Sequence, residues 1–373
     1  MFKILNIPNF IYPVFILSFF GISIQLYLSD WSSEDWQKII ILATVSCLAG
    51  YFFSKQKPNV AWNFSIIMSL ISFILLIAVL FLPEIRNIKS WIQIGAFTFQ
   101  PSELSKVGLI IANSIILGGN NGRGLGPLHG FLFCFGINSI IFILLAQQPE
   151  VGTIIVMLGI TWLQVICSKV SKFFSVLLPV LAVVTFFIGG LKLVPLYEKV
   201  LNPYQVKRIE TFLLGEESSS DDRYQVESAH FQIAQGGFWG SGFSESVKEE
   251  LHWLPERQND FVIAVFSRTG GFLLLFVVVS LYFWSAFGAM DFSDKMPSST
   301  SRQLVIGFAG YMAFHCFFNI AVSLELIPTT GFPLIPLSQG GSGWISLGCL
   351  VGLLLSVLSD HVNLYNSRVV GGK

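Results

Sequence analysis

Charged side chains are scarce in this sequence. Only 12% of the 373 residues are Asp, Glu, Lys or Arg, whereas about a quarter of a typical soluble domain is charged. Hydrophobic residues make up 53% of the chain, and the mean hydropathy is +0.69. This composition excludes an ordinary soluble globule and predicts an all-α polytopic membrane protein.

An excess of positive charge is also missing. The chain has 22 Lys and Arg against 22 Asp and Glu, so its formal net charge is zero. Binding to the phosphate backbone of a nucleic acid requires a basic surface. We therefore expect no nucleic-acid partner.

Cysteine is sparse as well. The five cysteines lie inside or at the ends of apolar segments and do not have the spacing of metal ligands. We interpret them as free thiols that pack like small hydrophobic side chains. From the sequence, the identity of any metal ligand is unknown.

Long apolar runs are abundant. A helix needs about 20 residues to cross ~30 Å of hydrocarbon, and segments of about this length recur along the chain. We predict about ten membrane-spanning helices in a single domain over residues 1–373. The expected ranges are 11–28, 39–53, 62–82, 103–117, 131–146, 150–167, 173–194, 261–287, 304–327 and 344–364.

The positions of the basic residues predict the orientation in the membrane. Short cytoplasmic loops retain Lys and Arg, and a cytoplasmic N-terminus gives the more uneven distribution. The inner side then carries Lys3, Lys55, Lys57, Arg123, Lys169, Lys172, Lys295, Arg302, Arg368 and Lys373, and the short outer loops carry Lys38, Arg86 and Lys89. Both termini are expected in the cytoplasm, and the long connection 195–260 is expected on the other side. A connection of that length is either functional or disordered.

A cluster of ionisable residues precedes one apolar run. Residues 254–261 read Leu-Pro-Glu-Arg-Gln-Asn-Asp-Phe, and the chain is then almost continuously apolar to position 287. A carboxylate at the edge of the hydrocarbon layer is costly to keep and indicates a functional site. Asp260, the last polar residue before the run, is therefore the first candidate for a catalytic residue.

Glu103 and Lys106 are expected to form an ion pair that is the second candidate for the catalytic site. Pro101 suits the first position of a helix, and Glu103 in its first turn complements the helix dipole. Lys106 shares a helix face with Glu103. Two interpretations stay open: an ion pair that only caps the helix at the membrane edge, or a pair that faces a polar cavity, because a lysine in an apolar segment needs a partner or water.

Two further segments combine proline with polar residues. Glu150 follows Pro149 at the start of a predicted helix, where it is either a simple capping carboxylate or a catalytic one. Residues 327–343 contain so many Pro and Gly that they cannot form a regular helix. Non-helical backbone at membrane depth is tolerated only where protein or a wet cavity covers it, so we expect this segment to line the site.

Together these segments resemble the SEDS family of polytopic membrane proteins, which includes the RodA, FtsW and SpoVE types. The motifs occur in the family's order and spacing over most of the chain from Ser90 onward. They are Ser90-Trp91-Ile92 with 99–106; 148–153; Arg208-Ile209 with Phe212-Leu213; Tyr224-Gln225 with Gly236-Gly237 and Gly240-Ser241-Gly242; 254–261; Asn319; and 328–342.

The resemblance implies an activity and its setting. It implies a peptidoglycan glycosyltransferase of the bacterial cytoplasmic (inner) membrane that joins lipid II units into glycan strands and releases undecaprenyl diphosphate. It also implies a large extracytoplasmic loop, contact with membrane lipid, a class B penicillin-binding protein transpeptidase as partner, and a divalent cation, Mg²⁺ or Mn²⁺. Local motifs favour the elongation type, RodA, over the division type, FtsW.

The resemblance further implies roles for individual residues. Asp260 matches the family's required aspartate and is expected to act as the general base that deprotonates the acceptor sugar's 4-hydroxyl. Lys106, paired with Glu103, is a candidate for the cation that keeps this carboxylate ionised. The substrate-binding candidates are Trp91, Gln100, Ser102, Arg208, Glu256, Arg257, Ser338 and Gln339, of which the two arginines suit the diphosphate.

Some positions depart from the family pattern. Gln258 and Asn259 stand where His-Thr is usual, Glu150 replaces an Asp, and Gln339 replaces a Tyr. Arg268 lies about two turns inside an apolar run and must find a partner, for which Glu227 or Glu256 is expected.

Two other functions stay open at this stage. One is a flippase for lipid-linked precursors, because acidic and basic groups in a cavity also suit transport. The other is a non-catalytic scaffold that recruits the transpeptidase.

Overall fold

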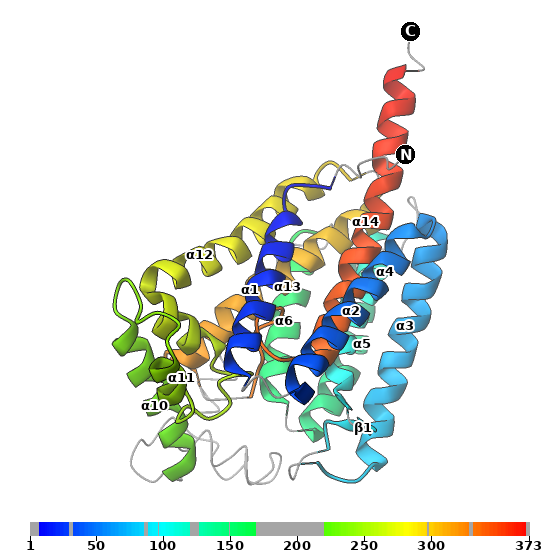
Figure 1. The fold of residues 1–373 in the computed structure, drawn as a ribbon. Coiled ribbons are helices and arrows are strands. Elements are labelled where there is room, and N and C mark those ends of the chain that lie inside the picture. Colours follow the sequence, from blue (N-terminus) through cyan, green and yellow to red (C-terminus); the bar gives the residue numbers. More distant parts are fainter. Residues whose placement is uncertain are drawn as a thin grey trace.

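Helices make up most of the computed structural model, which describes residues 7–29, 33–85, 89–95, 97–119, 127–148, 150–168, 220–296, 298–327 and 331–370. They form a bundle of long, roughly aligned rods (Figure 1). The elements are α1 (Tyr12–Leu28), α2 (Ser33–Lys55), α3 (Pro58–Ala78), η1 (Val79–Phe81), β1 (Ile92–Ile94), β2 (Phe97–Phe99), α4 (Pro101–Gly118), α5 (Pro127–Gln147), α6 (Val151–Ile166), α10 (Ser220–Gly236), α11 (Glu245–Leu251), α12 (Val262–Ser293), α13 (Ser299–Ser323) and α14 (Gly341–Val370).

The predicted membrane-spanning segments correspond to helices wherever the structure describes them. In the described part of the chain, 6 helices are long and apolar enough to cross a membrane, and α1 and α6 are shorter apolar helices. The predicted segment 173–194 lies outside the described residues. The prediction of an all-α multi-pass membrane protein is therefore confirmed, with the antiparallel hairpin β1–β2 as a small addition.

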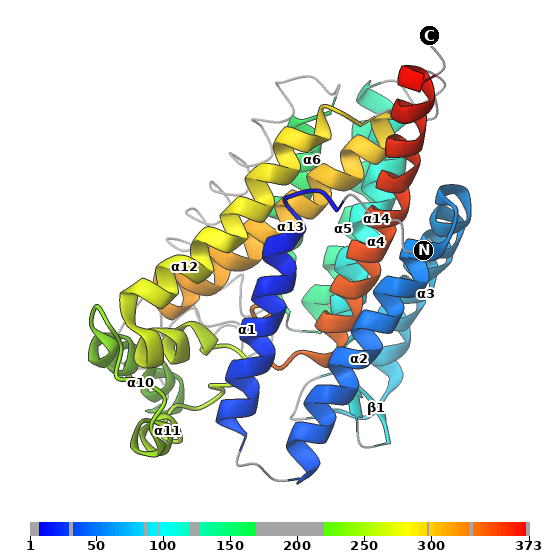
Figure 2. The same ribbon diagram turned by 45° about the horizontal axis from the view of Figure 1, so that its top comes forward.

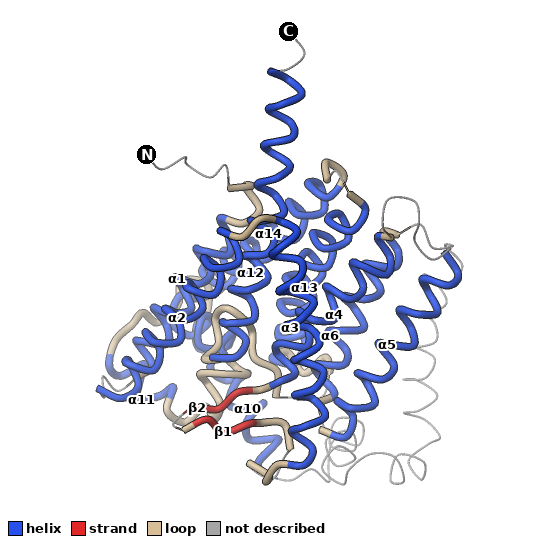
Figure 3. Tube along the Cα trace, turned by 90° about the vertical axis from the view of Figure 1, so that its right-hand side faces the viewer, coloured by secondary structure: helices blue, strands red, loops and turns tan. Residues whose placement is uncertain are grey.

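Helix α13 lies at the centre of the bundle. It packs against α12, α4 and α6, whereas α14 packs mainly on α2 and α3 packs on α4 (Figure 3). In the most apolar stretch of α13, 78% of the residues are buried inside the protein. Polar side chains on α13, notably His315 and Asn319, are consequently held inside the protein, where they need hydrogen-bond partners.

The two ends of the bundle differ. The hairpin β1–β2 lies at the same end as α10 and α11, and the C-terminal end of α14 projects from the opposite one (Figures 1 and 2). We call the first of these the hairpin end. Helix α4 begins there, directly after β2, and α12 begins there, after α11 and a series of turns.

Helix α12 is broken at Gly271, whose φ is 67° and ψ is −170°. The glycine-rich segment 236–242 fills the break. The amides of Ser241 and Gly242 donate to the carbonyls of Arg268 and Thr269, and the amides of Phe272 and Leu273 donate to the carbonyls of Gly237 and Phe238. The backbone groups that the break releases are thereby paired, and α10 is fixed alongside the first turns of α12.

Candidate functional site

Asp260 lies at the hairpin end, immediately before the N-cap of α12, and is half-buried. Its main-chain amide donates to the Glu256 carbonyl (3.1 Å), and its carbonyl accepts a hydrogen bond from the Asn319 side chain of α13 (3.0 Å). The carboxylate faces Gly331, since a Cβ built there would lie 3.6 Å from Asp260 Oδ2. The backbone of Asp260 is thus fixed by hydrogen bonds, and the residue at position 331 has no side chain.

The segment 331–340 is bound directly to the residues before Asp260. The Gln339 amide donates to the Gln258 carbonyl (2.7 Å), and the Ser338 hydroxyl donates to the Asn259 carbonyl (2.5 Å). These non-helical residues are largely buried, as expected for irregular backbone in an apolar setting. The segment and the turn carrying Asp260 therefore form one hydrogen-bonded unit.

Gln25 belongs to this unit and was missed by the analysis of the sequence. Its side chain is fully buried, and its Nε2 donates to the carbonyls of both Gln258 and Leu337, each at 3.0 Å. It ties α1 to the unit. The only signal was an amide side chain within the predicted apolar segment 11–28, a position where a polar group needs a partner.

Close contact between α1 and segment 331–340 makes Gly21 sensitive to substitution. A Cβ on Gly21 would overlap the carbonyl oxygen of Pro336, so we expect Gly21→Ala to lower the free energy of unfolding by about 1–3 kcal/mol. The matched control is Gly136→Ala on α5, where a Cβ meets nothing within 4 Å; its change should stay within about 1 kcal/mol. Equal melting temperatures of the two purified variants in detergent would contradict the expected overlap.

Glu103 and Lys106 are completely enclosed. Lys106 Nζ lies 2.7 Å from Glu103 Oε1, and the side chains of Lys106 and Glu103 are 0% and 2% exposed, respectively. Lys106 Nζ also lies 3.0 Å from His315 Nε2 and 4.6 Å from the centre of the Phe332 ring. Lys106 therefore interacts with protein groups and not with water, and the pair does not lie at a water-exposed helix start.

Glu150 is the centre of a neighbouring buried group. Its Oε1 accepts a hydrogen bond from Gln100 Nε2, and its Oε2 accepts one from Thr153 Oγ1 (2.9 Å). Gln100 and Ser102, two of the substrate-binding candidates, are 7% and 0% exposed. The structure thus places both inside the protein, where Gln100 positions a carboxylate.

Two other candidates lie on the turn that leads to Asp260. Glu256 is exposed, has a positive φ of 49°, and accepts a hydrogen bond from the Asn259 side chain (2.7 Å). Arg257 is half-buried, with one guanidinium nitrogen 2.9 Å from His252 Nδ1 and another 3.4 Å from the Leu251 carbonyl. Both lie close to Asp260 along the chain and at the same end of the bundle.

The remaining candidates are spread over this end of the molecule. Trp91 is half-buried just before β1, Gln339 is half-buried, and Ser338 is completely buried. Arg208 lies outside the described residues. Ser338 and Gln339 are thus joined to the turn of Asp260, and Trp91 directly precedes the hairpin at the same end of the bundle.

Arg268 has a different partner from the expected Glu227 or Glu256. Its guanidinium is paired with Glu250 and with the Ser241 hydroxyl, and its side chain is 5% exposed. That expectation was therefore wrong. The break in α12 explains the choice, because the segment filling it brings Ser241 next to Arg268, and α11 follows directly with Glu250.

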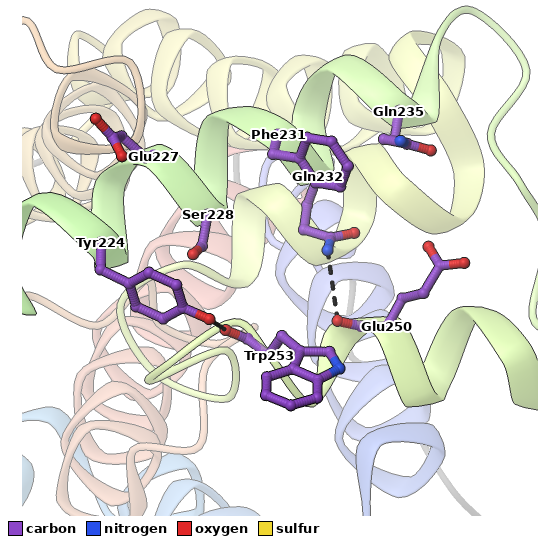
Figure 4. A pocket seen from close by; sticks show the side chains of 8 residues that line it. All are labelled: Tyr224, Glu227, Ser228, Phe231, Gln232, Gln235, Glu250 and Trp253. Atoms are coloured by element: carbon purple, nitrogen blue, oxygen red, sulfur yellow. Dashed lines mark hydrogen bonds between the residues drawn. The ribbon is translucent and has the colours of Figure 1, made fainter.

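A cavity of about 620 Å³ lies between α10 and the end of α11 with the turn that follows it (Figure 4). The Tyr224 hydroxyl donates to the Trp253 carbonyl (3.2 Å), and Gln232 Nε2 donates to the Glu250 carbonyl (3.4 Å). The cavity is lined by Tyr224, Glu227, Ser228, Phe231, Gln232, Gln235, Glu250 and Trp253. This cavity belongs to the long connection and does not include Asp260.

The donor groups needed for a resident metal ion do not converge within the described ranges. No three His, Cys, Asp or Glu side chains there are grouped so that they could hold a metal. The residues around Asp260 offer the Glu256 carboxylate together with arginine, amide and hydroxyl groups.

Comparison with known sequences places this arrangement in a family. The family described as cell cycle protein, FTSW_RODA_SPOVE, matches residues 1–363. A probable peptidoglycan glycosyltransferase FtsW of Geobacter sp. is 30% identical over 76% of this chain and 75% of its own length. The stage V sporulation protein E of Bacillus subtilis is 29% identical over 89% and 88%.

Solved structures share the fold. The RodA rod shape determining protein of Thermus thermophilus aligns with a TM-score of 0.67 and 20% identity, covering 95% of this chain and 98% of its own. A chain from a peptidoglycan synthase complex, described as coordinating polymerization and crosslinking, aligns with a TM-score of 0.72 and 21% identity, covering 95% and 99%.

Proposed function

Because this chain belongs to the FtsW, RodA and SpoVE family of cell cycle proteins, as its motifs predicted, we propose that it is a peptidoglycan glycosyltransferase that polymerises lipid II into glycan strands. Relatives over most of its length are named as peptidoglycan glycosyltransferases. The observation that carries the proposal is the fixed, half-buried position of Asp260 against the backbone at Gly331.

Asp260 acts as the general base in the proposed reaction. Its carboxylate takes the proton of the acceptor sugar's 4-hydroxyl while that oxygen attacks the anomeric carbon of the donor, and the bond to undecaprenyl diphosphate breaks with inversion. Position 331 has no side chain to compete for the carboxylate. Arg257, which is three residues before Asp260, and Arg208 supply positive charge for the departing diphosphate, because arginine pairs well with phosphate oxygens.

The proposed location is the cytoplasmic membrane of a bacterium, with both termini in the cytoplasm. The charge pattern supports this orientation, and α10, α11 and the start of α12 lie at the end of the bundle opposite the C-terminal end of α14 (Figure 1). Asp260 directly precedes the N-cap of α12. In this orientation Asp260 is on the face where lipid-linked sugars are displayed.

The proposed partner is a class B penicillin-binding protein, and the proposed process is elongation, as in the RodA type. One structural neighbour comes from a complex that coordinates polymerization with crosslinking, which supports the partnership. The related sequences include FtsW and SpoVE types, whereas the structural neighbours include RodA. The elongation role therefore rests on the local motifs at Pro255 to Arg257 and Thr330 to Leu334.

A divalent cation, Mg²⁺ or Mn²⁺, stays a proposal based on the family. Within the described residues no three His, Cys, Asp or Glu side chains are grouped, and Mg²⁺ is commonly held by one or two carboxylates plus substrate phosphates, so we expect the cation to bind with the substrate's diphosphate. Mn²⁺ binding, followed by electron paramagnetic resonance, should be weak for the protein alone and should appear when lipid II is added. Tight binding without lipid would contradict this expectation.

Purified protein and lipid II test the proposed activity, alone and with a class B transpeptidase. We expect a polymer that lysozyme digests. Movement of lipid II across vesicle membranes without polymer would instead identify a flippase. Polymer formation only by an added enzyme would leave the chain as a scaffold.

A further inference from the structure

His315 is a buried titratable residue to which neither the sequence motifs nor the proposed reaction gives a role. It lies on the central helix α13 and is fully buried. Its Nδ1 is 2.8 Å from the Tyr311 carbonyl oxygen, and its Nε2 is 3.0 Å from Lys106 Nζ. Both ring nitrogens therefore have a polar partner.

These two partners define the protonation state of the ring. A carbonyl oxygen can only accept a hydrogen bond, so Nδ1 must carry a proton and donate. A lysine ammonium can only donate, so Nε2 must be unprotonated and accept. The neutral imidazole with its proton on Nδ1 is the one form that satisfies both contacts.

The ammonium of Lys106 is fully used by this arrangement. Its three N–H donors face Glu103 Oε1, His315 Nε2 and the ring of Phe332, and the side chain is completely buried. A cation over an aromatic ring is attracted to its face. Lys106 is therefore committed to holding its neighbours and has no donor left for a diphosphate.

Phe332 connects this group to the catalytic aspartate. Its ring lies 4.9 Å from the His315 ring, and its carbonyl accepts a hydrogen bond from Asn319 (2.9 Å), whose side chain also donates to the Asp260 carbonyl (3.0 Å). Gly331, adjacent to Phe332, faces the Asp260 carboxylate. Lys106 and Phe332 thus act on Asp260 through packing and backbone contacts.

We propose that His315 is a positioning residue for glycan polymerisation: as a neutral acceptor it fixes the Lys106 ammonium against Phe332 and so sets the backbone beside Asp260. The inference rests on the proposed function, since positioning has a consequence only if Asp260 is the base. It also changes the expected role of Lys106 from a direct cation to a support.

Two substitutions separate positioning from mere packing. His315→Gln keeps an oxygen that can accept from Lys106, whereas His315→Leu keeps the apolar volume and loses the acceptor. We expect His315→Leu to lower kcat by about tenfold or more, because a small misplacement of reacting groups has large effects, with KM for lipid II little changed. His315→Gln should restore most of kcat. Equal activity of both variants and wild type would overturn the proposal.

Nitrogen NMR of histidine-labelled protein provides a readout that does not depend on activity. The chain has five histidines, and the signal lost in His315→Gln assigns the ring. We expect the neutral form with the proton on Nδ1 in the wild type, and in Lys106→Met a changed Nε2 resonance, because the ammonium from which Nε2 accepts is removed. A proton on Nε2 would overturn the inference even if His315→Leu fails to fold.

Failure of the inference can be told apart from failure of the proposed function. If wild-type protein forms no polymer, the function is wrong. If the wild type is active and Asp260→Asn is inactive, but His315→Leu is as active as the wild type, only the positioning role is wrong.

Discussion

Replacing Asp260 by Asn is expected to reduce lipid II polymerisation by about 10²–10⁴-fold, the usual contribution of a general base. The amide has nearly the same shape but cannot take up the proton of the attacking hydroxyl. The main-chain N–H and carbonyl of Asp260 make hydrogen bonds that do not involve the carboxylate, and these remain in the variant. Initial rates of glycan formation at saturating lipid II measure the effect.

The same substitution at the other end of α12 is a matched control. Asp294 is the C-cap of this helix, is 73% exposed, and pairs with Arg302 at 2.9 Å. Asp294→Asn should retain wild-type activity, because exposed ion pairs contribute little. The base assignment is wrong if Asp260→Asn keeps wild-type activity, and it is undermined if the variant melts well below the wild type.

The second large effect is expected from Lys106→Met. Removing one partner of a buried ion pair leaves an uncompensated charge and typically destabilises a protein by about 3–5 kcal/mol. Glu103 is enclosed, and within the described part of the chain its Oε2 has no hydrogen-bond donor. The double variant Glu103→Gln with Lys106→Met should recover most of the loss, because it removes the buried negative charge. A double-mutant cycle of thermal unfolding in detergent measures both quantities.

A surface pair with the same spacing provides the comparison. Lys38 and Asp35 are also three residues apart in a helix, but their side chains are 41% and 48% exposed and lie 3.9 Å from each other. Lys38→Met should change stability by less than about 1 kcal/mol. If Lys106→Met is equally mild, the buried pair does not stabilise the fold, and its contribution lies in the reaction alone.

Hydropathy alone was enough to locate the spanning helices in the described residues, because an apolar run in lipid has few alternatives to a helix. Asp260 could be found for a related reason, since a carboxylate at the start of such a run is costly. Gln25 and His315 are different. Each is a buried polar residue in a largely apolar helix, and the partner of Gln25 at Gln258 is 233 residues away, so only the packed structure identifies it.

The partner of Arg268 could not be predicted from the sequence either, although it lies nearby in the chain. Several glutamates lie nearby in the sequence, and Glu250 is 18 residues away. Distance along the chain could not choose among them, because the choice depends on the break at Gly271 and on the segment that fills it. The sequence predicts that Arg268 needs an ion-pair partner, but the path of the backbone determines that this partner is Glu250.

That break also determines which sequence changes the protein tolerates. Hydropathy assigns residues 236–242 to a connection between spans, and connections usually accept substitutions. A Cβ on Gly240 or on Gly271 would nevertheless overlap the backbone of the other segment, and both residues have positive φ. We therefore expect substitutions at these two glycines to be tolerated as poorly as substitutions in the interior of the bundle, although Gly240 lies outside every apolar run.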